Sequence, residues 1–140
     1  MKKEMITLLN AFYYNAALGA DAIEAILSSA KDEAFQLTLY RQLQYYRQQE
    51  SRLTEQMHGL YEVPGSMLRL WMDLMIRCKT LYGLTDERLA KMMMQGSQMG
   101  IIQLVRALNH SGKVPEQLHA QGEKILEHEQ AFINELKPFL

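Results

Sequence analysis

The chain has 140 residues, enough for one domain (residues 1–140) with its own hydrophobic core, and 48% of them are hydrophobic. Three prolines, eight glycines and no alternating apolar pattern exclude a β-rich fold and predict an all-α protein. A net charge of −1 excludes the basic surface that nucleic acid or an anionic membrane requires, and the single Cys78, which cannot form an internal disulfide, fits a cytoplasmic protein.

The first expected helix covers residues 3–29. Its apolar residues recur at spacings of three and four, the pattern of a bundle helix: Ile6, Leu9, Tyr13, Ala16, Ala20, Ile23 and Leu27. The basic start and Ala20-Asp21-Ala22 mimic a secretory signal, but the apolar pattern continues across that apparent cleavage site, so we expect a folded helix. No run of 18 apolar residues predicts a transmembrane span.

Four further helices are expected over residues 33–58, 66–82, 86–109 and 115–137. Their ends carry ordinary start and stop signals: Asp32 and Thr85 as N-caps, Gly59 and Gly83 as stops, and Pro115 at a first helical position.

The segment 66–82 determines the expected topology. Its length of about 17 residues corresponds to roughly 25 Å, whereas the other four helices correspond to roughly 35–40 Å at the same rise per residue. We therefore expect a ferritin-like four-helix bundle in which the segment 66–82 is a short helical crossover between the second and third bundle helices. In that arrangement the helices 33–58 and 86–109 run parallel. The alternative is a five-helix up-and-down array.

The order of these elements resembles a group of bacterial ferritin-like proteins of unknown function. The local likeness is strongest at Gly65-Ser66-Met67-Leu68, at Trp71-Met72-Asp73-Leu74 and at the Gly96-Ser97 step. The resemblance covers nearly the whole chain as architecture, and it implies a ferritin-like bundle without by itself implying iron.

Two glutamates interrupt apolar stripes, and these are the strongest functional clue. Glu50 falls at the missing position of the stripe Leu39, Leu43, Tyr46, Leu53, Met57 and Leu60. Glu129 falls at the missing position of the stripe Leu118, Gly122, Ile125, Phe132, Leu136 and Phe139. An ionised carboxylate that faces a core is costly unless it is paired, protonated or bound to a cation. We interpret both as carboxylates that accept hydrogen bonds from tyrosines, with Tyr13 and Tyr46 as candidate donors, or that turn toward solvent.

The same two glutamates are weak candidates for a metal site. A ferritin-type di-metal centre takes one glutamate from each of two helices and Glu-x-x-His from the other two. Here the third residue after Glu50 is Leu53, and the third after Glu129 is Phe132, so both imidazoles are missing.

The remaining helices do not complete such a centre either. The helix 86–109 offers Gln95, Gln98 and Gln103 in place of a carboxylate. The first helix offers Glu24, whereas counting from the turn places Glu50 level with Phe12 and Tyr13, some 18 Å from Glu24 by helix rise. We expect no stoichiometric iron or manganese and no other cofactor.

A second possible metal site would lie at one end of the bundle. The spacing Glu-x-x-His occurs at Glu55–His58 and Glu116–His119, and the crossover would bring both pairs to the end where His110 also lies. Imidazole and carboxylate suit zinc or nickel. These five residues flank the apolar stripes and do not face the core, so polar helix ends are the preferred interpretation.

No nucleophile–base pair and no phosphate-binding loop is present in the sequence, so we expect a non-catalytic scaffold or interaction protein, not an enzyme, that acts as a homodimer or with a protein partner. Gly96-x-x-x-Gly100 predicts close approach of a neighbouring helix. A metal-binding ferritin-like protein, with iron or zinc, is the alternative. A carrier of an apolar ligand is a third hypothesis, and it requires a cavity of a few hundred Å³ lined by Met and Tyr.

Overall fold

The computed structural model describes residues 2–58, 69, 73 and 84–140. Within them it has four long helices and no strand: α1 (Lys2–Leu27), α2 (Glu33–Met57), α4 (Asp86–Asn109) and α5 (Glu116–Leu136), followed by a 3-10 turn, η1 (Lys137–Phe139). The all-α prediction is confirmed, and these helices begin and end within two residues of the expected positions.

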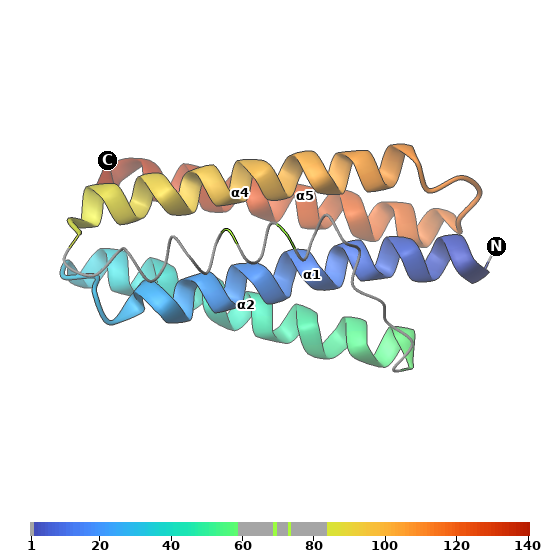
Figure 1. The fold of residues 1–140 in the computed structure, drawn as a ribbon, viewed down its shortest axis with the longest axis horizontal. Coiled ribbons are helices and arrows are strands. Elements are labelled where there is room, and N and C mark those ends of the chain that lie inside the picture. The colour runs from blue at the N-terminus through green and yellow to red at the C-terminus, as the bar shows by residue number, and fades with distance from the viewer. Residues whose placement is uncertain (1, 59–68, 70–72, 74–83) are drawn as a thin grey trace.

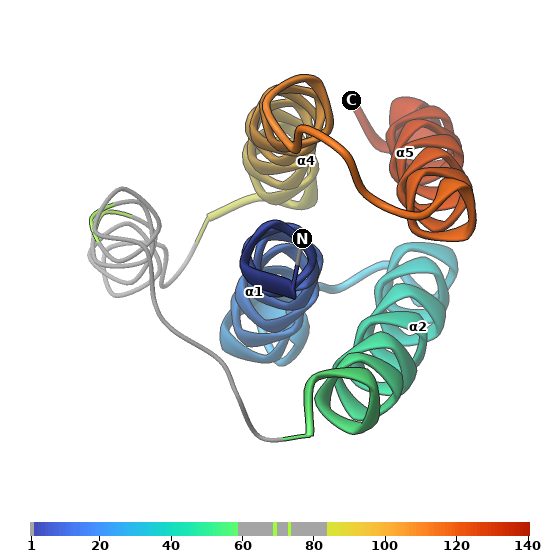
Figure 2. The same cartoon turned by 90° about the vertical axis from the view of Figure 1, so that its right-hand side faces the viewer.

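The four helices form a bundle (Figure 1). Seen along its axis in Figure 2, α1 lies beside α2 and α4, and α5 lies beside the same two helices. Neighbouring helices are antiparallel, so α2 and α4, on one diagonal, run in the same direction, as predicted. The expected crossover helix over residues 66–82 lies outside the described residues, apart from two isolated positions.

Side-chain caps begin two of the helices. The Asp32 carboxylate accepts a hydrogen bond from the Phe35 amide at 3.0 Å, and the Thr85 hydroxyl accepts one from the Arg88 amide at 3.3 Å, so both N-cap predictions are confirmed. Pro115 is itself the N-cap of α5 and not its first helical residue.

A contact between distant segments joins the two helical pairs. The Asp86 carboxylate, at the start of α4, accepts hydrogen bonds from the backbone amides of Lys31 and Asp32 at 2.9 and 2.8 Å. This ties the turn between α1 and α2 to the start of α4.

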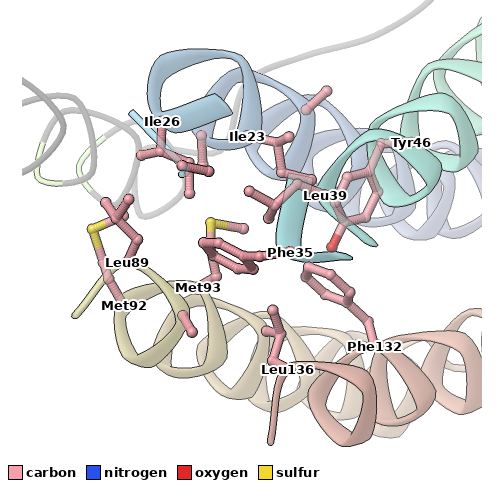
Figure 3. Packing of buried hydrophobic residues seen from close by; sticks show 14 of the residues in the cluster. Ile23, Ile26, Phe35, Leu39, Tyr46, Leu89, Met92, Met93, Phe132 and Leu136 are labelled. Atoms are coloured by element: carbon pink, nitrogen blue, oxygen red, sulfur yellow. The ribbon is translucent and has the colours of Figure 1, made fainter. Parts of the chain in front are cut away.

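The core consists of two apolar clusters along the bundle. Figure 3 shows one of them, in which Phe35, Leu39 and Tyr46 of α2 face Phe132 and Leu136 of α5. The predicted stripes of α2 and α5 are therefore confirmed in the described residues.

Helix α1 is buried on more sides than its predicted stripe. Leu8, Phe12, Leu18 and Ala22 are buried in addition to most of the expected positions, because α1 packs against α4 as well as α2. None of the described helices is both long enough and apolar enough to cross a bilayer.

Candidate functional site

A buried carboxylate lies between the helices. Glu129 of α5 is 0% exposed. The Tyr46 hydroxyl of α2 lies 2.7 Å from its Oε1 and 3.0 Å from its Oε2, and therefore donates to the carboxylate. The expected hydrogen bond from Tyr46 to one of the two glutamates is thus present.

The other two helices reach the same carboxylate. Asn15 of α1 donates from Nδ2 to Oε1 of Glu129 at 2.9 Å. The buried Ser97 of α4 also forms a side-chain hydrogen bond with Glu129. Each helix therefore supplies one polar side chain to a single layer, which we call the polar layer: Asn15, Tyr46, Ser97 and Glu129.

Burial governs the protonation of the polar layer. It raises the pKa of the Glu129 carboxyl, because the ionised form loses its hydration, and the hydrogen bonds from Tyr46, Asn15 and Ser97 only partly offset this. Burial, followed by the nearby Glu129 charge, also raises the pKa of Tyr46 well above its usual value, so Tyr46 stays a neutral donor. Within the described residues, no lysine, arginine or histidine forms an ion pair with Glu129.

Two members of the polar layer, Asn15 and Ser97, were not among the candidates from the sequence. The only signal for Asn15 is that a polar residue interrupts an apolar stretch. Ser97 differs from the residues expected on that helix, since Gln95 and Gln98 are exposed and Gln103 is partly buried.

Glu50, the second stripe glutamate, lies outside the polar layer. It is partly buried, and it accepts a hydrogen bond from Nη1 of Arg47 at 2.7 Å, not from a tyrosine. The same guanidinium pairs through Nη2 with Glu24 and, at 3.5 Å, with Asp21 of α1. Burial raises the pKa of the Glu50 carboxyl, and the charge of Arg47 opposes that shift.

The predicted separation of Glu24 and Glu50 is therefore wrong, because both carboxylates contact one arginine. The register explains the error. The Tyr46 ring packs over Gly19, so an antiparallel count places Glu50 level with about Asn15, not with Phe12 and Tyr13. The long Arg47 side chain spans the remaining rise between the two glutamates.

Replacement of Glu50 by leucine is expected to change the free energy of unfolding by less than about 1 kcal/mol, because partly exposed ion pairs contribute little and Arg47 keeps Glu24 and Asp21. Arg47→Met is the matched comparison. It leaves three carboxylates without their shared cation and should destabilise the protein more. Thermal melts measure both, and a loss of more than about 5 °C for Glu50→Leu would contradict the expectation.

A histidine packs beside the polar layer. The His128 ring stacks on Tyr45 with centroids 3.4 Å apart, and its Nε2 lies 3.2 Å from Oε1 of Gln42. Burial lowers the pKa of His128, with Glu135 opposing, and burial raises the pKa of Tyr45 to about 12, followed by the Glu129 charge. His128 is therefore a packed, neutral ring at pH 7.

A cavity of about 110 Å³ opens on the polar layer, between α1 and α4. Its walls are mainly apolar and include Leu18, Ala22, Met92, Met93 and Leu104, while all four residues of the polar layer line its inner side. Asp73 also lines it. The cavity is smaller than the apolar-carrier hypothesis required.

The two glycines of the expected close approach behave differently. A Cβ on Gly100 would lie 2.6 Å from Oδ1 of Asn15, so α1 does come close there. A Cβ on Gly96 would meet no atom within 4 Å, so the prediction of close approach is wrong at that position.

The five residues of the second possible metal site are all exposed: Glu55, His58, His110, Glu116 and His119. The end of α2 and the start of α5 do share one end of the bundle with the end of α4 (Figure 1), and Gln56 and Gln121 exchange hydrogen bonds at 3.0 and 2.8 Å. However, among the described residues no three acidic, histidine or cysteine side chains are grouped so that they could hold a metal ion.

The chain has no significant match among protein-family models, curated proteins or solved structures.

Proposed function

We propose that this chain is a non-catalytic, cytoplasmic member of the ferritin-like bundles, in which a hydrogen-bonded polar layer stands where a di-metal centre would lie. The observation that carries the proposal is the polar layer itself. One inward side chain from each of the four helices meets at one buried level, which is how ferritin-like proteins arrange their metal ligands.

The helix arrangement supports the ferritin-like part of the proposal. Parallel α2 and α4 require a connection that returns along the bundle, as in folds with one long crossover (Figure 1). A plain up-and-down bundle would make these two helices, if consecutive members, antiparallel.

The donor set does not fit a pair of divalent ions. The polar layer holds one carboxylate, Glu129, beside an amide, a phenol and a hydroxyl, while Glu50 is bound to Arg47. A di-iron or di-manganese centre needs several carboxylates to supply ligands and to balance charge. The polar layer therefore serves packing and specificity and not redox chemistry.

The surface would then carry the function, as a scaffold that binds a second copy of the chain or another protein. Helix α4 exposes three large apolar side chains at a spacing of three: Met99, Ile102 and Val105, which are 41%, 55% and 38% exposed. Apolar side chains gathered on one helix face favour association.

The test is the metal content of the protein purified without a histidine tag. We expect no stoichiometric iron or manganese. About two irons per chain, lost on Glu129→Ala or Glu50→Ala, would overturn the proposal in favour of a di-metal protein. One zinc ion, lost on His58→Ala or His119→Ala and below about pH 6, would instead support the site at the bundle end.

A further inference from the structure

We propose that the cavity between α1 and α4 binds a small organic ammonium ion, with its charged nitrogen at Glu129 and its hydrocarbon part against the methionines of α4. This goes beyond the proposed scaffold function, which does not use the cavity.

Charge is the first argument. The titratable side chains among the described lining residues are two acids, Glu129 and Asp73, and no lysine, arginine or histidine is among them. Glu129 is fully buried and has hydrogen-bond donors but no cationic partner among the described residues. A buried carboxylate is stabilised far more by an opposite charge than by neutral donors alone. The cavity thus offers a site for one positive charge and disfavours an anion.

The acceptors on the polar side suit an ammonium group, which has up to three N–H donors. Tyr46 and Asn15 both lie closest to Oε1 of Glu129, while Oε2 has only the longer contact from Tyr46, 3.0 Å. The Asn15 carbonyl oxygen lies next to Gly100, which lines the cavity, and the Ser97 hydroxyl lines it as well. An ammonium at this level would meet the carboxylate together with these two neutral acceptors.

The walls exclude a metal ion and favour a carbon skeleton. Met92, Met93 and Leu18 offer no oxygen ligands that could replace the hydration shell of a divalent ion. Methionine side chains adapt to varied apolar shapes. The volume of about 110 Å³ compares with the roughly 150 Å³ of an engineered cavity that holds benzene, so about four or five non-hydrogen atoms fit.

The probe is n-butylamine, which is protonated at neutral pH, with n-butanol and butyrate as uncharged and anionic controls of the same length. Amide chemical shifts of the full-length protein report binding. We expect saturable shifts at Gly19, Gly96 and Gly100 with butylammonium, and affinities at least about tenfold weaker for both controls.

Three variants locate the site. Glu129→Gln keeps the shape of the side chain and removes its charge, and it should weaken butylammonium binding by at least about tenfold. Glu127→Gln removes an exposed charge from the same helix and should leave binding unchanged. Gly96→Leu, at a position with no atom within 4 Å of the new Cβ, adds a side chain at the cavity wall and should also abolish binding while the protein stays folded.

Equal binding of butanol and butylammonium, tighter binding of butyrate, unsaturable shifts, or equal losses for Glu127→Gln and Glu129→Gln would each overturn the proposal. Manganese alone provides the remaining test. Paramagnetic broadening at the Ser97 and Gly100 amides would show a metal site and would also overturn it, whereas its absence together with butylammonium binding would support it. Butylammonium binding leaves the metal test of the proposed function unaffected, so the two proposals fail separately.

Discussion

Glu129→Leu is expected to destabilise the protein by about 2–4 kcal/mol, or roughly 6–15 °C in Tm for a chain of 140 residues. The substitution removes the acceptor of Tyr46, Asn15 and Ser97 in a place that water does not reach. Each buried donor left without a partner costs about 1–3 kcal/mol, while removal of the desolvated carboxylate returns part of that cost. The sequence alone predicted a neutral or stabilising effect, because it did not reveal three donors.

A second substitution separates these two contributions. Tyr46→Phe removes the most deeply buried donor, so the double variant Glu129→Leu/Tyr46→Phe should be more stable than Glu129→Leu alone. Urea unfolding of the wild type, both single variants and the double variant gives the coupling energy. A coupling near zero would show that the Tyr46–Glu129 hydrogen bond does not stabilise the fold.

The pH dependence of Glu129→Gln checks the charge. Because the pKa of Glu129 is raised in the folded protein, its favourable contribution is complete below the unfolded value of about 4.5 and is lost as the pH rises through the folded value. Glutamine stays neutral, so the stability of the variant relative to wild type should grow as the pH rises above about 4.5, and then level off. The lowered pKa of His128 acts equally on both proteins and cancels in the difference. A difference that does not change with pH would contradict the raised pKa.

Much of the described fold followed from local patterns. Apolar spacing and the caps at Asp32 and Thr85 define helices within two residues of their ends, because these signals depend on neighbours within one or two turns. The parallel run of α2 and α4 followed from helix lengths alone. Glu129 was marked by its place in an apolar stripe, which depends only on the period of α5.

The rest of the site depends on how the helices are rotated and shifted against each other, which local patterns do not specify. Whether α4 presents Ser97 or Gln98 to the core is decided by packing against α1 and α5. The level of Glu50 depends on the register of α1 against α2, and a shift of two or three residues between them was enough to misplace it. That register is fixed by the packing of Tyr46 on Gly19, a contact between residues far apart in sequence.

Gly19→Ala is the sharpest test of that register and should destabilise the protein by about 1–3 kcal/mol, although alanine normally favours a helix. A Cβ on Gly19 would collide with Cε2 of the Tyr46 ring and lie 2.5 Å from its Cζ. The ring cannot simply turn away, because its hydroxyl is held by Glu129 and the residue is 3% exposed. Gly96→Ala is the matched control: its Cβ meets nothing within 4 Å, so helix propensity alone should stabilise the protein by about 0.5–1 kcal/mol. Thermal or urea unfolding of both variants should give opposite signs, and a Gly19→Ala variant as stable as Gly96→Ala would show that α1 and α2 do not pair in this register.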